Sequence, residues 1–279
     1  MTAALAACEA IVRQADPDRY IAALFAPAEK RPLLFALYAF NHELARVGES
    51  VREPMMGEIR LQWWREAVEG ARAGQPRAHD VARGLAEVFA SADLPSDLFE
   101  TMIDARAFDV GPETFATLEA LEAYADATSA NLMRLAAHVL DDGAHDALAC
   151  EAGIAYALAG ILRAIPFHAA RRKLFLPRDL LAAEGLAPEE VFAGRSGAGL
   201  TKIIGRIAGR AREHLKEARA LPKPKAALAA FLPAATVPGY ATTVTRSAFD
   251  PFRDPADVAQ RARHLDHRAT PAHSRQPEL

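Results

Sequence analysis

Two stretches of the sequence have the spacing of a metal-binding helix face but hold few of the residues that bind metals. If each stretch is helical, residues three or four positions apart share one face, which groups Tyr38, His42, Ala45 and Glu49, and separately Gly160, Ala164 and His168. Carboxylates at such a spacing can together hold Mg²⁺, which prefers oxygen ligands. Glu49 is the only carboxylate of the two groups, so neither group forms a paired Mg²⁺ site.

The two histidines give a second, weaker metal hypothesis. A site built on His42 and His168 needs a third protein ligand, and the sequence offers no candidate for it. A neutral imidazole is a poor ligand for Mg²⁺, and a protonated one repels it. We therefore expect no cofactor, with Mg²⁺ required only if the protein is an enzyme. Both stretches are interpreted as the residual polar lining of a pocket or as solvated helix faces.

A basic run, Arg171-Arg172-Lys173, follows the second stretch, and Arg163 lies within that stretch. These side chains could bind a diphosphate through charge-assisted hydrogen bonds. They could also contact anionic lipid headgroups, at about 1 kcal/mol per basic residue near the surface. The third interpretation is a solvated basic turn after a helix.

Three aromatic residues are candidates for the lining of an apolar cleft: Trp63, Trp64 and Tyr124. Adjacent residues of a helix point in different directions. The alternative is therefore that one tryptophan ring packs in the core, while the other lies at a surface and contacts a partner or a membrane.

Composition excludes several classes of protein. The chain has 279 residues, and its 36 acidic residues outnumber its 33 basic ones, so we expect no nucleic-acid partner. The apolar start of the chain lacks a basic leader and is interrupted by Glu9, which argues against a secretory signal. We expect a cytoplasmic protein, with peripheral contact to the inner membrane left open.

Hydrophobic periodicity predicts an all-α fold. Leu33, Leu37, Phe40, Leu44 and Val47 follow the spacing of one helical stripe. The same spacing recurs from Leu118 to Val139 and from Ile154 to Ile165, whereas the strict alternation typical of a half-buried strand is missing. We therefore expect a single helical domain over residues 1–250.

Breaks in the pattern predict where the helices end. Pro32 can open a helix, and Pro166 should bend or end the one that begins before Ile154. Further helices are expected over Leu200–Ala220 and Lys225–Tyr240. Residues 251–279 are polar and rich in proline, and we expect them to form a frayed tail.

A series of short motifs resembles the squalene/phytoene synthase family in the expected order: Asp18-Arg19-Tyr20, Phe25-Ala26-Pro27, Tyr38-Ala39-Phe40, Gln62-Trp63-Trp64, Ile161-Leu162-Arg163 and Phe175-Leu176-Pro177. The resemblance covers about Asp18 to Tyr240 and implies the isoprenoid synthase fold. In that family each of two helices carries a D-x-x-x-D pair that binds Mg²⁺ and a prenyl diphosphate. The matching positions here are Ala45 with Glu49, and Ala164 with His168.

The segments Phe40–Ala45, Ile161–His168 and Arg171–Lys173 are similar to a branch of this family that also lacks the aspartates. That branch includes a mitochondrial respiratory complex I assembly factor. The resemblance therefore implies a non-catalytic assembly or scaffolding role, with a respiratory complex subunit or another assembly factor as the partner. The alternatives are a prenyltransferase that joins two prenyl diphosphates head to head and a protein that binds a prenyl lipid.

Overall fold

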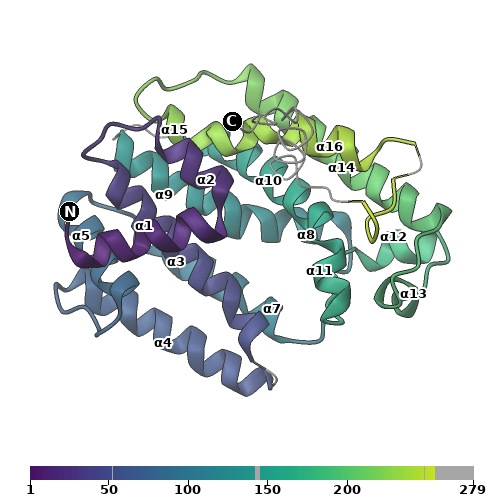
Figure 1. Cartoon of the computed structure of the whole chain (residues 1–279), viewed down its shortest axis with the longest axis horizontal. Coiled ribbons are helices and arrows are strands. Elements are labelled where there is room, and N and C mark those ends of the chain that lie inside the picture. The colour runs from purple at the N-terminus through teal and green to yellow at the C-terminus, as the bar shows by residue number, and fades with distance from the viewer. Residues whose placement is uncertain (52, 142–144, 248, 255–279) are drawn as a thin grey trace, which may run out of the picture.

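The computed structural model describes residues 1–51, 53–141, 145–247 and 249–254. Every regular element in these ranges is helical, which confirms the predicted all-α fold. The helices pack side by side into one elongated body (Figure 1). Residues 255–279, which make up most of the predicted polar tail, lie outside the described part of the chain.

The helices follow one another with short connections. The first half of the chain contains α1 (Ala3–Ala15), α2 (Pro17–Ala23), α3 (Arg31–Ser50), α4 (Pro54–Arg72), α5 (Asp80–Ser91), α6 (Ser96–Ala105) and α7 (Ala107–Val110). The second half contains α8 (Leu118–Ala125), the π-helical turn η1 (Asp126–Ala130), α9 (Asn131–Leu140), α10 (Asp146–Arg163), α11 (Ile165–Ala170), α12 (Arg178–Ala183), α13 (Pro188–Phe192), α14 (Ala198–Ala220), α15 (Leu228–Phe231), the 3₁₀ turn η2 (Leu232–Thr236) and α16 (Val237–Val244).

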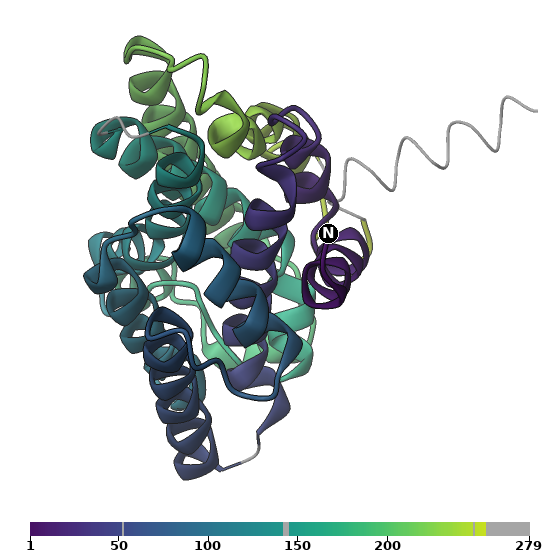
Figure 2. The ribbon, with the colours of Figure 1, turned by 90° about the vertical axis from the view of Figure 1, so that its left-hand side faces the viewer.

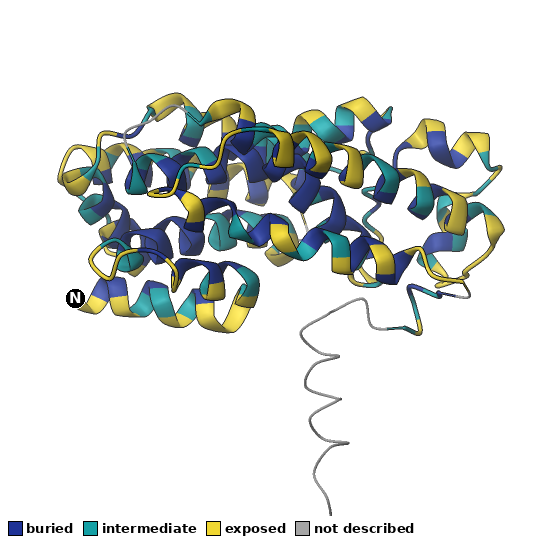
Figure 3. Cartoon of the chain, turned by 90° about the horizontal axis from the view of Figure 1, so that it is seen from above, coloured by how far each residue is buried: buried dark blue, intermediate teal, exposed yellow. Residues whose placement is uncertain are grey.

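α10 forms the centre of the bundle. It packs against α8, η1, α9, α14 and α16, and buried residues occur on nearly every side of it, as expected for a helix without a solvated face. Figure 3 shows the same distribution for the whole molecule, with buried residues in the interior and exposed residues along the outer faces. Among the described residues, no helix is both long and apolar enough to cross a bilayer.

The predicted stripe of α3 is confirmed. Its five apolar positions, Leu33 to Val47, are all buried, and Pro32 lies in the first turn of the helix. The predicted break at Pro166 is also confirmed. α10 ends at Arg163, Ala164 leaves helical geometry, and α11 begins at Ile165 with the proline in its first turn.

Two segments differ from the sequence prediction. The stripe from Leu118 to Val139 is buried as expected, but the helix widens into the π turn η1 between α8 and α9. The expected single helix over Lys225–Tyr240 is instead α15, η2 and α16, because Pro233 and Pro238 interrupt the helical hydrogen bonds. The sequence predicts that the folded domain ends at residue 250 and that a frayed tail follows. In the structure, Pro251 is buried and Phe252 packs against the core, so residues 251–254 still belong to the folded body.

A close approach between α10 and η1 depends on Gly153. A Cβ placed on this residue would lie 2.3 Å from the Cα of Ala130 in η1. We therefore expect Gly153→Ala to destabilise the protein by about 1–3 kcal/mol, because α10 and η1 must separate. Urea denaturation gives the free energy of unfolding. Gly160→Ala, in the same helix, is the matched control.

A Cβ on Gly160 meets nothing within 4 Å, so Gly160→Ala should leave the protein unchanged or stabilise it by up to about 1 kcal/mol. Equal effects of the two substitutions would contradict the close approach of α10 to η1.

Candidate functional site

A cavity of about 870 Å³ opens between the helices of the bundle. Its walls come from the start of α2, from α3, from the α6–α7 junction, from α8 and η1, and from α10 and α11. These segments are distant in the sequence, so the cavity exists only in the folded chain. Its volume is in the range of sites that hold a small organic ligand.

The cavity brings together most residues of the two predicted helix faces. Ala45 and Glu49 line it from α3, and Gly160, Ala164 and His168 line it from the α10–α11 region. The other two residues of the first face are not in its wall. Tyr38 is buried in the core, and its hydroxyl has no hydrogen-bond partner in the part of the chain that the structure describes. His42 is half-buried on α3.

All four predicted basic residues line the cavity. Arg171 stacks over the ring of Phe167, with its guanidinium carbon 3.6 Å from the ring centroid. Arg172 has a left-handed backbone conformation, with φ of 54°. Lys173 donates a hydrogen bond to the carbonyl of Gly111, and its partial burial lowers its pKa.

The tryptophans lie elsewhere. Trp63 and Trp64 line a separate hollow of about 300 Å³ together with His79, so they do not share a cleft with Tyr124, which lines the central cavity. Trp64 is buried and Trp63 is half-buried. This agrees with the alternative interpretation, in which one ring packs in the core and the other lies near the surface.

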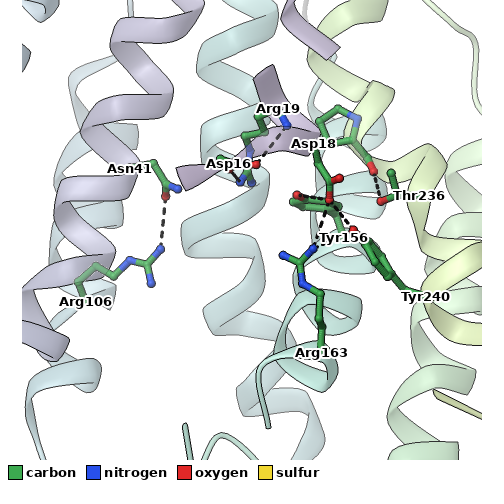
Figure 4. Close-up of polar contacts among 10 residues, drawn as sticks. Asp16, Asp18, Arg19, Asn41, Arg106, Tyr156, Arg163, Thr236 and Tyr240 are labelled. Atoms are coloured by element: carbon green, nitrogen blue, oxygen red, sulfur yellow. Dashed lines mark hydrogen bonds and ion pairs between the residues drawn. The ribbon is translucent and has the colours of Figure 1, made fainter. Parts of the chain in front are cut away.

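The structure adds a polar cluster at one end of the cavity that sequence reasoning did not identify (Figure 4). Asp18 accepts hydrogen bonds from the hydroxyls of Tyr240 and Tyr156, at 2.9 and 3.2 Å. Arg163 lies 3.5 Å from the same carboxylate and donates to the Tyr240 hydroxyl at 2.8 Å. The Asp18 carboxylate is therefore held by three side chains from α10 and α16.

The neighbouring carboxylate, Asp16, is also paired. It forms an ion pair of 2.7 Å with Arg19. The Arg19 guanidinium is buried and stacks over the ring of Tyr156, at 4.8 Å from the ring centroid. This stacking connects the Asp16 pair to the Asp18 cluster.

A second cluster in the cavity wall surrounds Asp109 of α7. The Asp109 carboxylate pairs with Arg106 at 3.0 Å and accepts from the Tyr124 hydroxyl at 2.8 Å. Arg106 also donates to Tyr124 at 2.7 Å and to the side-chain oxygen of Asn41 at 3.3 Å. Burial raises the pKa of Tyr124, so its hydroxyl stays protonated and donates to the carboxylate.

The donor set of the cavity does not fit Mg²⁺. Its carboxylates are Asp16, Asp18, Glu49 and Asp109, and the three aspartates are bound by arginine or tyrosine side chains. Among the described residues there is no group of three or more His, Cys, Asp or Glu that could hold a metal ion. A Mg²⁺ site needs converging oxygen ligands, and here each of the three aspartates is paired with a different arginine.

His168 does not supply the missing ligand. Its ring stacks on Phe175 with 4.4 Å between centroids. Burial, followed by the nearby charge of Arg171, lowers the pKa of His168 to about 4. The imidazole is therefore neutral at pH 7, and neutral imidazole is a poor ligand for Mg²⁺.

The charges of the wall favour an anion instead. Six cationic side chains line the cavity, namely Arg19, Arg106, Arg163, Arg171, Arg172 and Lys173, against its four carboxylates. Three of these cationic residues, Arg171, Arg172 and Lys173, are consecutive in the sequence and directly follow α11. The buried Ser129 hydroxyl of η1 also lines the cavity and has no hydrogen-bond partner within the described residues. The arrangement offers cationic contacts to an acidic group without a metal.

Several known proteins are similar to this chain. The human protein named NADH dehydrogenase (ubiquinone) complex I, assembly factor 6 is 32% identical over 249 residues, which cover 88% of this chain and 75% of that protein. Phytoene synthase from Thermus thermophilus is 30% identical over 209 residues, covering 74% of this chain and 71% of the enzyme. The sequence similarity thus extends to both assembly factors and a synthase.

Solved structures confirm the isoprenoid synthase fold. The squalene synthase HpnC from Alicyclobacillus acidocaldarius superposes with a TM-score of 0.76 at 22% identity, covering 89% of this chain and 95% of that one. A dehydrosqualene synthase also gives a TM-score of 0.76, at 19% identity, and covers 95% of this chain and 94% of its own. The family model for squalene/phytoene synthase matches residues 12–268. The chain therefore belongs to the squalene/phytoene synthase family.

Proposed function

We propose that this protein is a non-catalytic member of the squalene/phytoene synthase family that helps to assemble a respiratory complex. Its role would be that of a scaffold or assembly factor which binds a subunit of the complex or another assembly factor. The fold would supply a rigid helical body for this contact, and the reaction of the synthases would be absent.

The observation that carries this proposal is the pairing of the cavity carboxylates. Departure of a diphosphate requires neutralisation of its charge, which metal ions supply in many phosphoryl-group sites. In this chain Asp16, Asp18 and Asp109 already neutralise arginines. Glu49 lines the cavity from α3, and the matching positions of the other face, Ala164 and His168, supply no carboxylate. Without paired metal sites, ionisation would lose several kcal/mol of stabilisation.

The similarity to assembly factor 6 supports the same proposal. It extends over 88% of this chain in the human protein. The similarity to phytoene synthase from Thermus thermophilus, at 30% identity, supports the enzymatic alternative. In that alternative the protein is a transferase that joins two prenyl diphosphates head to head. The two functions differ in products and in their need for Glu49, and each difference can be measured.

The first test is a search for products. Purified full-length protein is incubated with Mg²⁺ and farnesyl or geranylgeranyl diphosphate, with Thermus phytoene synthase as the positive control. We expect no squalene, phytoene or cyclopropyl intermediate above the level of boiled protein, because nothing in the cavity clusters carboxylates for Mg²⁺. Appreciable product, detected by mass spectrometry, would refute the non-catalytic function.

The second test asks whether Glu49 is needed in the cell. In a strain that lacks this gene, we expect lower NADH:ubiquinone oxidoreductase activity in isolated membranes, and full rescue by both the natural chain and Glu49→Gln. A scaffold does not need a lone cavity carboxylate, whereas any residual Mg²⁺ site would. Immunoblotting verifies equal amounts of the two proteins.

Two results would contradict the proposal. If Glu49→Gln fails to rescue at equal abundance, the cavity has a chemical role. If deletion leaves the oxidoreductase activity unchanged, the protein does not act in assembly of this complex.

A second candidate function, the binding of a prenyl lipid or related acidic amphiphile, is favoured by the surplus of cations in the cavity. Farnesyl monophosphate in the presence of EDTA is the probe. If the cavity binds it, Arg171→Glu should weaken binding about tenfold or more, since charge-assisted hydrogen bonds contribute about 1.5–3 kcal/mol.

Arg195→Glu, at an exposed arginine outside the cavity, is the control and should leave the affinity unchanged. Isothermal titration calorimetry gives both affinities. A loss of similar size in both variants, or no binding by the natural chain, would exclude this second function. Neither result bears on the assembly role.

A further inference from the structure

A group of exposed apolar residues lies outside every site described so far. Ile21, Leu24 and Phe25, at the end of α2 and in the turn after it, are 55%, 41% and 73% exposed, and Leu228 at the start of α15 is 42% exposed. α2 packs against α15, and Figures 1 and 2 both show the two helices side by side at the upper edge of the molecule. We refer to these four residues as the α2–α15 patch.

The segments that carry the patch are basic. Residues 21–31 contain Glu29, Lys30 and Arg31, and residues 221–228 contain Lys223 and Lys225 without an acidic residue. Lys223 is held in place, because its ammonium group donates to the carbonyls of Ala218 and Arg219 at 2.7 and 3.1 Å. The Lys225 side chain is exposed. The surface thus combines protruding apolar side chains with a net positive charge.

From these features we propose that the α2–α15 patch docks the protein onto a membrane that contains anionic lipid. Exposed aliphatic and aromatic residues beside lysines are the features of proteins that lie in the interface of a bilayer. The apolar side chains enter the boundary between headgroups and acyl chains, and the lysines contact the negative surface. This inference goes beyond the proposed function, because it holds for a scaffold and for a lipid-binding protein alike.

Docking by this surface would also determine how far the central cavity lies from the membrane. α2 carries Asp18 and Arg19 in the cavity wall, while Ile21, Leu24 and Phe25 are on its exposed side. A helix with its side chains is about 10 Å thick. The polar end of the cavity therefore lies about one helix diameter behind the membrane surface.

A second apolar surface on α4 provides the comparison. Met55, Met56 and Ile59 are 73%, 48% and 55% exposed. Residues 53–60, however, contain two glutamates and one arginine, so this surface lacks the positive charge of the α2–α15 patch. Electrostatic attraction to anionic lipid favours the patch over the α4 surface.

The test is flotation of the full chain with vesicles of phosphatidylcholine, with and without phosphatidylglycerol. We expect binding to the anionic vesicles that weakens at high salt. The double substitution Leu24→Ser with Phe25→Ser should lower the partition coefficient by about tenfold or more, since two apolar side chains no longer enter the bilayer. Lys225→Glu should lower it by about fivefold or more.

Matched controls separate the patch from general surface effects. Met55→Ser with Ile59→Ser changes an apolar pair that is at least as exposed in total, and Lys216→Glu changes an exposed lysine of α14. Both should bind vesicles as the natural chain does. Circular dichroism verifies that each variant is folded, and Lys225→Glu provides a test that removes no apolar contact.

Three outcomes would overturn the proposal. The natural chain could fail to bind anionic vesicles. The patch variants could bind as well as the controls. The natural chain could form dimers that the patch variants lose, without binding vesicles, which would assign the patch to a second copy of this chain.

Discussion

The site of this protein depends on the binding of its cavity carboxylates by arginine and tyrosine side chains. Asp18 is held by Tyr156, Arg163 and Tyr240, and Asp109 is held by Arg106 and Tyr124. In the low-dielectric interior, such charge-assisted contacts replace the water that each ion loses. The Asp109–Arg106 pair is buried, and removing one partner of such a pair typically costs about 3–5 kcal/mol because the other charge is left unpaired.

The same pairing limits what the cavity can bind. A carboxylate that accepts two or three hydrogen bonds and an ion pair has few lone pairs left for a metal. Asp18 and Asp109 also belong to separate clusters, each with its own arginine. An anion meets the opposite situation, because Arg171, Arg172 and Lys173 are brought to the wall by the end of α11.

The fold could be predicted from the sequence because its signals are local. The stripe of α3 and the break at Pro166 depend on residues a few positions apart. The π turn at Asp126–Ala130 was not predicted, because the apolar stripe runs through it without a break; in the fold, this turn packs closely against α10 at Gly153. The division of the segment Lys225–Tyr240 into α15, η2 and α16 could have been predicted, because Pro233 and Pro238 are visible in the sequence and each interrupts helical hydrogen bonds.

The candidate site was only partly predictable for a related reason. Periodicity placed Ala45, Glu49, Gly160, Ala164 and His168 on two faces, and the structure brings these faces to one cavity. Two of the ion pairs, Asp16 with Arg19 and Asp109 with Arg106, are local, since each joins residues three positions apart. The partners of Asp18 are distant in the sequence, because Arg163 and Tyr240 lie 145 and 222 positions from it. Asp18-Arg19-Tyr20 was a visible motif, but only the fold shows which side chains it meets.

The electrostatics of the cavity connect the two functions considered for it. A divalent cation would add two positive charges to a wall that already has six cationic side chains and four carboxylates. An acidic group would instead reduce the imbalance, and repulsion between like charges in a half-enclosed site is screened less than at an open surface. Belonging to a family of synthases does not remove this constraint, because a fold fixes the positions of side chains and not their charges. The charges favour a cavity that binds an anion, or none, over one that gathers metal ions to expel a diphosphate.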